Sequence, residues 1–210
     1  MEVIKEYNGI LYRLSEDEDA YTVVGIGSSI EDDITIPTHI DTIPVVCIEW
    51  GAFENCTFKS ITSTSITNIG SAAFKGCKML TTVNIHNVNI IEDEVFYNCT
   101  SLTTVNISGA TEIGMDTFCN CTSLSDINIV SCQLSTIEWG TFDNCQNLKN
   151  ITLPKSVTNI DSYAFNKCKD LSITILSREI SITDYTFKDS DNITVQYNGP
   201  GQGNVLISEL

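Results

Sequence analysis

The 210-residue sequence has few basic residues, with 11 Lys and Arg against 27 Asp and Glu and a formal net charge of −16. A surface this acidic repels a phosphate backbone and an anionic membrane, so we expect no nucleic-acid partner. The sequence has no run of eighteen apolar residues, which excludes a membrane-spanning helix. Residues 1–7 also lack the basic and apolar segments of a secretory signal, so we expect a cytoplasmic protein if Met1 is the genuine start.

The motifs of common catalytic sites are absent as well. The sequence contains no G-x-S-x-G, H-E-x-x-H or P-loop motif and only two His residues. The acidic clusters at 16–19, 31–33 and 92–94 lack the ligand alternation of a calcium loop. We therefore predict that the protein is not an enzyme, has no catalytic residues and holds no metal or cofactor.

Pro and Gly are sparse, with 4 and 12 copies, whereas hydrophobic residues make up 42% of the chain. This apolar content is too high for a disordered chain. The many Ile, Thr, Ser and Asn residues favour strands and turns over long helices.

A repeat of about 22 residues runs through most of the sequence. A Phe recurs at steps of 21 to 24 residues, an Ile lies five residues before each of these Phe, and a Cys lies three residues after the first six. Ser190 takes the place of Cys after the seventh. The repeated Phe residues are Phe53, Phe74, Phe96, Phe118, Phe142, Phe165 and Phe187.

Most repeats also contain an alternating apolar pair, such as Val83 and Ile85 or Val105 and Ile107. Such a pair predicts a short strand with one face turned inward. A unit this short cannot bury its apolar face alone, so successive units must stack around a shared core. The repeat therefore predicts an elongated solenoid of short parallel strands, with turns and short helical segments in each coil.

The two ends of the chain differ from the repeats. Residues 10–14 and 21–26 read as two strands of a β-hairpin, which we expect to cap the first coil within residues 1–33. The repeats occupy residues 34–198, and a tail follows at 199–210. Residues 204–210 could fold back as a cap strand, although a loose end is favoured.

The repeat unit resembles a known class of leucine-rich repeat. The clearest copy is Leu148-Lys149-Asn150-Ile151-Thr152-Leu153-Pro154, followed by Val157, Ile160, Ala164-Phe165 and Cys168. This pattern is similar to the BspA-like, or treponemal, leucine-rich repeat, and the similarity covers residues 8–198. The resemblance implies a right-handed solenoid that serves adhesion and protein–protein contact, and it implies a secreted or cell-surface location.

The nine Cys residues permit several interpretations. Six share one phase of the repeat, which predicts a column of buried thiols rather than disulfides, because stacked side chains rarely reach disulfide torsions. Cys47, Cys119 and Cys132 lie outside this column and are the better candidates for exposed or reactive thiols. Cys119 and Cys121 form a C-x-C pair, but no second pair follows at zinc-site spacing.

Two sets of side chains are candidates for contact with a partner. The polar residues between the inward strand positions should form columns on the concave face, where they can bind a partner or satisfy one another in an amide ladder. Trp50 and Trp139 both lie in Ile-Glu-Trp-Gly-x-Phe on the outer edge, where a Trp can anchor a partner or pack over the next turn. The concave-face candidates are Thr82, Asn84, Thr104, Asn106, Asp126 and Asn128.

These observations together predict a non-enzymatic protein-binding module that serves adhesion or binds a host or matrix protein. An intracellular protein–protein scaffold is the alternative, and the many thiols favour it because disulfide-free chains are typical of reducing compartments. Carbohydrate binding is a third possibility, which the shortage of aromatic residues on the concave strands disfavours.

Overall fold

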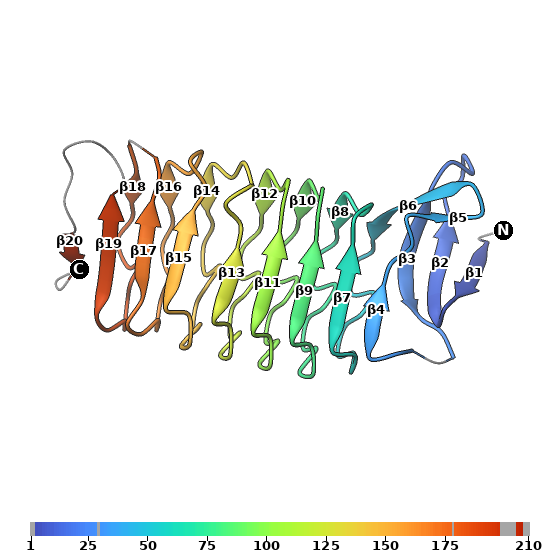
Figure 1. Cartoon of the computed structure of the whole chain (residues 1–210), viewed down its shortest axis with the longest axis horizontal. Helices are drawn as coiled ribbons and strands as arrows, with labels where there is room; N and C mark the ends of the chain where they lie inside the picture. The colour runs from blue at the N-terminus through green and yellow to red at the C-terminus, as the bar shows by residue number, and fades with distance from the viewer. Residues whose placement is uncertain (1–2, 29, 178, 198–204, 208–210) are drawn as a thin grey trace.

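The computed structural model is an elongated solenoid in which the chain winds through successive coils from the N-terminal to the C-terminal end (Figure 1). It describes residues 3–28, 30–177, 179–197 and 205–207. The strands lie in two rows along the solenoid, and each repeat contributes one long strand and one short strand. The predicted leucine-rich-repeat solenoid is therefore confirmed.

The long strands pair in parallel and form one side of the solenoid. Their side chains alternate between buried and less buried positions, as in the partly exposed Thr82 and Asn84 beside the buried Val83 and Ile85. The buried residues therefore face the core, and the residues between them face solvent. The long strands are β4 (Asp33–Thr35), β7 (Ser60–Ser63), β9 (Thr82–Ile85), β11 (Thr104–Ile107), β13 (Asp126–Asn128), β15 (Asn150–Leu153), β17 (Ser172–Ile175) and β19 (Ile193–Tyr197).

The second row consists mainly of two-residue strands. Each contains the Ile that precedes the repeated Phe by five residues, and this Ile is buried in nearly every coil. The row comprises β6 (Ile43–Ile48), β8 (Asn68–Ile69), β10 (Ile90–Ile91), β12 (Glu112–Ile113), β14 (Thr136–Ile137), β16 (Asn159–Ile160) and β18 (Ser181–Ile182).

Both rows are interrupted at the same coil. The long strands divide into the sheets β4 to β13 and β15 to β20, and the short strands divide between β12 and β14. This coil contains the 24-residue step from Phe118 to Phe142. Residues 129–135 link β13 to β14, whereas only residues 108–111 link β11 to β12. The longer link shifts the backbone out of pairing register.

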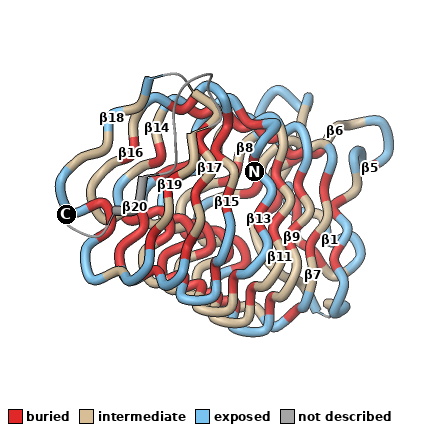
Figure 2. Tube along the Cα trace, turned by 60° about the vertical axis from the view of Figure 1, so that its left-hand side comes forward, coloured by how far each residue is buried: buried red, intermediate tan, exposed pale blue. Residues whose placement is uncertain are grey.

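The repeated Phe residues form a continuous column through the core. Their rings are buried and stack on one another, with centroids 5.1 to 5.4 Å apart from Phe74 to Phe165. The stack passes through the interrupted coil, where Phe118 and Phe142 lie 5.4 Å apart at an angle of 3°. Figure 2 shows this buried interior enclosed by exposed turns. The core is therefore continuous even where the sheets are not.

The segment around each Phe is a series of turns, so the expected short helical segments are wrong for the described residues. In every coil the residues two before and two after the Phe have positive φ, for example Glu94 at 56° and Asn98 at 60° around Phe96. A right-handed helix cannot continue through a left-handed residue. This requirement explains why Asn or Gly follows most of the Phe residues by two positions.

The N-terminal cap contains the expected hairpin, in which β2 (Ile10–Leu14) pairs antiparallel with β3 (Tyr21–Ile26). The structure adds a strand that the sequence analysis missed, β1 (Ile4–Tyr7), which pairs antiparallel with β2. β3 then pairs in parallel with β6 and joins the cap to the solenoid. A further short strand, β5 (His39–Ile40), pairs antiparallel with β6.

The C-terminal end differs from the favoured expectation of a loose tail. Residues Val205–Ile207 form β20, which pairs antiparallel with β19 and covers the edge of the last long strand. An unpaired edge strand leaves a row of free N–H and C=O groups, which explains the advantage of a covering strand. The rest of the expected tail, residues 199–204 and 208–210, lies outside the described residues.

Candidate interaction surfaces

The outward side chains of the long strands form a surface that we call the strand face. The parallel register places Thr104 beside Thr82 and Asp126, and it places Asn106 beside Asn84 and Asn128. The structure therefore brings the six concave-face candidates together as two adjacent columns. Because the backbone beneath them is hydrogen-bonded, these side chains are held in place at little cost in entropy.

The Asn column satisfies part of its own hydrogen-bonding capacity. The Nδ2 atom of Asn106 donates to Oδ1 of Asn84 over 2.8 Å, and both residues are only partly exposed. Asn128 is exposed, and its Oδ1 accepts a hydrogen bond from the backbone N–H of Val130 over 3.3 Å. Among the six candidates, the exposed side chains are therefore Asp126 and Asn128 on β13, at the interrupted edge of the sheet.

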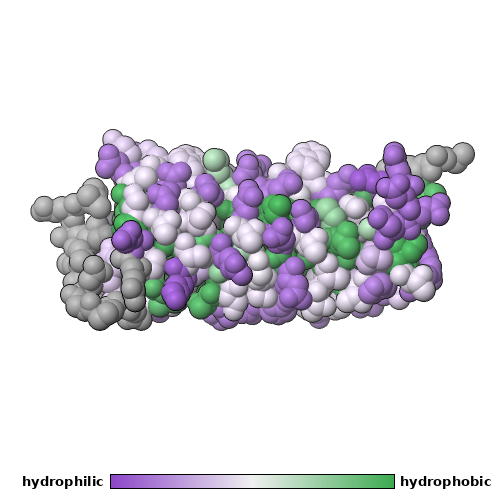
Figure 3. Space-filling view, turned by 90° about the horizontal axis from the view of Figure 1, so that it is seen from above, coloured by the Kyte–Doolittle hydropathy of each residue, from purple (hydrophilic) through white to green (hydrophobic). Residues whose placement is uncertain are grey.

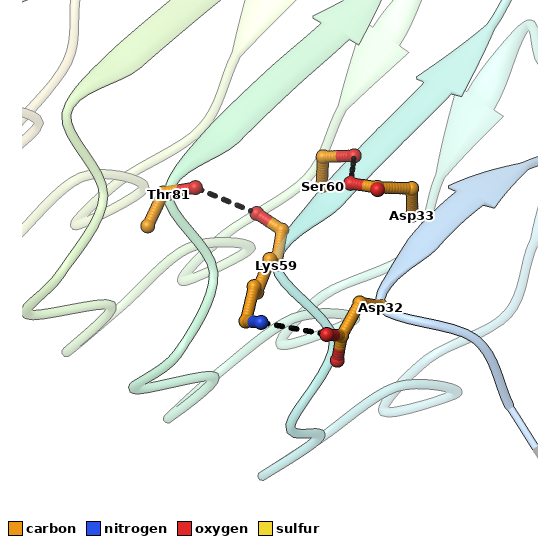
Figure 4. Close-up of polar contacts among 5 residues, drawn as sticks. All are labelled: Asp32, Asp33, Lys59, Ser60 and Thr81. Atoms are coloured by element: carbon orange, nitrogen blue, oxygen red, sulfur yellow. Dashed lines mark hydrogen bonds and ion pairs between the residues drawn. The ribbon is translucent and has the colours of Figure 1, made fainter.

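Polar contacts also tie the coils together where the long strands begin (Figure 4). Lys59 forms an ion pair of 2.6 Å with Asp32, and the hydroxyl of Ser60 donates to Asp33 over 2.6 Å. The hydroxyl of Thr81 donates to the backbone carbonyl of Lys59 over 3.0 Å. The following coils repeat this last contact with Thr103 and Ser125. Thr81, Thr103 and Ser125 thus form a column of hydroxyl residues. The sequence analysis missed this column, although the three residues recur at the repeat spacing of 22.

Trp50 and Trp139 lie on the outer turns, where 69% and 40% of their surfaces are exposed. Trp139 packs against Tyr163 of the next coil with ring centroids 5.5 Å apart, and Tyr163 stacks on Tyr185 at 5.9 Å. Trp50 instead lies at the wall of a surface pocket. In the view of Figure 3, hydrophobic residues form separate small patches among hydrophilic ones. Of the two Trp residues, Trp50 is the more available to a partner.

The repeat-phase Cys residues stabilise the stacking of the coils. The thiol of Cys99 donates to the backbone carbonyl of Phe74 in the preceding coil over 3.1 Å, and Cys121 donates in the same way to Phe96 over 3.2 Å. Ser190 keeps this contact with its hydroxyl, which donates to Phe165 over 2.7 Å. Cys56 belongs to the first of these coils, which no repeated Phe precedes, and it is only half-buried.

The expectation of exposed thiols outside this column is wrong for two of the three residues. Cys119 and Cys132 are buried, and only Cys47 is partly exposed. Burial raises the pKa of Cys119 to about 12, with a further contribution from Asp143 and Asp116. Cys119 lies one residue after the core Phe118, and its backbone carbonyl accepts a hydrogen bond from the Asn98 N–H of the preceding coil over 2.8 Å. Sequence position relative to the repeat did not reveal this burial.

Several acidic side chains lie close together on the outer turns that also carry Trp50 and Trp139. Burial first, and then the neighbouring carboxylates of Glu94 and Asp143, raise the pKa of Asp116 to about 6. Burial and the nearby Asp161 likewise raise the pKa of Glu138. Repulsion between neighbouring carboxylates on these turns therefore adds to the effect of burial on both side chains.

Replacing Asp116 with Asn is expected to stabilise the protein at pH 7. Because the pKa of Asp116 is about 6 in the folded chain against an ordinary value of 3.8, its contribution is most favourable below pH 4 and is lost as the pH rises through 6. The side chain is partly exposed, so after screening we expect a gain of about 1 kcal/mol at pH 7 and none at pH 4. Urea unfolding at both pH values measures this.

The control for that measurement is Asp126→Asn, which removes an exposed carboxylate from the strand face. A surface change of this kind should alter the free energy of unfolding by less than about 0.5 kcal/mol. Equal gains in the two variants at pH 7 would show that the net charge of the chain, rather than the surroundings of Asp116, is responsible.

Neither a metal site nor a membrane span emerges from the described part of the chain. It contains no group of three or more His, Cys, Asp and Glu side chains placed to hold a metal ion. It also has no helix with the length and apolar character needed to cross a bilayer.

Comparison with known structures places the fold among bacterial repeat proteins. The T. pallidum leucine-rich repeat protein TpLRR is 23% identical, with a TM-score of 0.70 over 88% of this chain and 91% of that one. A leucine-rich repeat protein from Eubacterium ventriosum (23% identity, TM-score 0.63) is matched over 79% of this chain and 50% of its own. The pneumococcal vaccine antigen PcpA (21%, TM-score 0.63) is matched over 93% and 50%. The chain thus spans half the length of the latter two.

The sequence itself identifies the family. No curated protein matches the sequence at a significant level. The family model for BspA-type leucine-rich repeat regions matches in six copies, over residues 28–138 and 111–198. These matches include nearly every coil of the solenoid. The chain belongs to the BspA-type leucine-rich repeat family.

Proposed function

We propose that the chain is a non-enzymatic protein-binding module whose strand face contacts the partner. The observation that carries this proposal is the alignment of Thr82, Asn84, Thr104 and Asn106 in register across paired strands. These side chains are uncharged, in contrast to the acidic turns, and their amide and hydroxyl groups both donate and accept hydrogen bonds. Such a strip suits a polar loop or strand of a partner protein.

The proposed binding function is consistent with either of two locations of the protein, the cell surface or the cell interior. Adhesion, with a host or matrix protein as the partner, is supported by family membership, because members of this family are often surface proteins. An intracellular scaffold is supported by the nine free Cys residues, since secreted chains commonly oxidise their thiols. Capture of proteins from a matrix extract and from a lysate of the producing cell, followed by mass spectrometry, tests which setting supplies the partner.

Replacing Asn106 and Asn128 together with Arg is expected to abolish binding of the captured protein and to lower the melting temperature by no more than about 5 °C, since one hydrogen bond, from Asn106 to Asn84, is lost. Both side chains point away from the core, so the added bulk meets the partner and not the fold. A variant with Trp50 and Trp139 both changed to Ala is the matched comparison. Loss of the partner in the Trp variant, with retention in the Arg variant, would place the binding surface on the outer turns.

A further inference from the structure

A pocket with a volume of about 390 Å³ opens beside Trp50 on the outer turns. The indole of Trp50 forms one wall and is 69% exposed. The remaining lining comes from three successive coils and consists of Glu54, Ser71, Ala72, Lys75, Asp93 and Glu94. We call this feature the Trp50 pocket.

The pocket exists because a small residue occupies one repeat position. Ala72 lies two residues before Phe74, and the equivalent residue before Phe165 is Tyr163. Both have positive φ, 56° for Ala72 and 61° for Tyr163. Tyr163 fills the space beside Trp139, with ring centroids 5.5 Å apart. Ala72 leaves the equivalent space beside Trp50 open. The site beside Trp50 is therefore open, and the site beside Trp139 is filled.

The charge of the pocket selects its ligand. Three carboxylates line it, from Glu54, Asp93 and Glu94, against the single ammonium of Lys75. Lys75 forms an ion pair with Glu94 and lies 4.9 Å from the centre of the Tyr97 ring. Glu54 and Asp93 are exposed, and neither forms an ion pair within the described residues. One oxygen of Asp93 accepts a hydrogen bond from the backbone N–H of Met115 over 2.8 Å, and its charge is not balanced by an ion pair among the described residues. An aromatic wall beside an excess of carboxylates attracts a cation.

We propose that the Trp50 pocket binds an arginine side chain of a protein partner. A guanidinium can stack on the exposed indole and direct its N–H groups to Glu54 and Asp93. A contact of this kind already exists within the chain on the outer turns. The ammonium of Lys188 lies 5.6 Å and 5.7 Å from the ring centres of Tyr163 and Tyr185. This inference rests on the proposed function only in taking the partner to be a protein.

The probe for this site is the peptide acetyl-Gly-Arg-Gly-amide, titrated into the full chain and observed by saturation-transfer NMR. The same peptide with citrulline in place of arginine keeps the shape and loses the charge. We expect the arginine peptide to bind with a dissociation constant in the millimolar range and the citrulline peptide to bind at least about tenfold more weakly. Equal binding of the two peptides would overturn the assignment of a cation.

Ala72→Tyr is the decisive variant because it fills the pocket and changes no charge. The substitution copies the native Tyr163, which shows that the repeat accepts Tyr at this position and at positive φ. We expect it to weaken binding of the arginine peptide at least about tenfold. Unchanged binding would show that the peptide responds to the acidic surface in general and would overturn the proposal.

A matched pair of charge variants separates the pocket from the net charge. Glu54 and Asp143 occupy the same repeat position, one residue after the repeated Phe and four residues after Trp50 and Trp139 respectively. Glu54→Gln should weaken the arginine peptide severalfold, and Asp143→Asn should leave it unchanged. Equal effects of the two variants would contradict the pocket assignment. The variant Asn106→Arg with Asn128→Arg should bind the arginine peptide as the native protein does. The peptide titration therefore tests the Trp50 pocket separately from the strand face.

Discussion

Phe118→Ala is expected to lower the free energy of unfolding by about 3–5 kcal/mol. Phe118 is fully buried, and its ring stacks 5.4 Å from both Phe96 and Phe142. The contact with Phe142 crosses the coil where neither row of strands is paired, so the packing of Phe118 adds there to the turn hydrogen bonds, such as that from Phe118 N–H to the Thr141 carbonyl over 2.9 Å. Urea unfolding followed by circular dichroism measures the change.

Two controls make the result interpretable. Phe118→Leu keeps most of the apolar volume and should cost about 1.5 kcal/mol or less. Met115→Ala lies three residues away on the exposed turn and should cost less than about 0.5 kcal/mol. A loss below 1 kcal/mol in Phe118→Ala would show that the Phe column is not the main support of the solenoid.

Thiol labelling should distinguish two of the nine Cys residues from the other seven. In the native protein we expect slow reaction at Cys47 and Cys56 because only these two are partly exposed, although burial raises the pKa of Cys47, and a hydrogen bond with Cys77, followed by burial, raises that of Cys56. All nine should react in denaturant. Burial raises the pKa of Cys168 to about 12, so at pH 8 only about one part in 10⁴ of a thiol with that pKa is the reactive thiolate. Labelling followed by mass spectrometry identifies the sites.

The outcome also tests the role of the thiol column. Three or four disulfides in the purified protein would contradict the hydrogen-bonded thiols described above. Fast native labelling of Cys119 would contradict its burial within the turn after Phe118.

The spacing of Phe, Ile and Cys predicted the solenoid because each of these residues occupies one buried position per coil. The same logic predicted the register of the strand face, where a constant step of 22 residues places Asn84 beside Asn106 and Asn128. The expected helical segments were wrong because two residues in each turn adopt positive φ, and Glu94 and Tyr163 give no sign of this in their side chains.

The candidate surfaces were less predictable than the fold. The identical motifs around Trp50 and Trp139 gave no reason to separate them, because the difference lies in the next coil, at Ala72 and Tyr163. The burial of Cys119 depends likewise on the packing of neighbouring turns. The register between coils follows from the constant repeat step and can be predicted from the sequence. The burial of a side chain that depends on which residue the next coil supplies requires the structure.

The interruption between β13 and β15 has a consequence for how the solenoid unfolds. In a linear array, stability is a sum of terms for each unit and for each contact between neighbours. The contact at this coil lacks the strand pairing that joins the other coils, although it retains the Phe stack and turn hydrogen bonds such as that from Phe118 N–H to the Thr141 carbonyl over 2.9 Å. We therefore expect the coils up to β13 and those from β15 onward to act as two cooperative units, with local opening, measured by hydrogen exchange, beginning at their boundary.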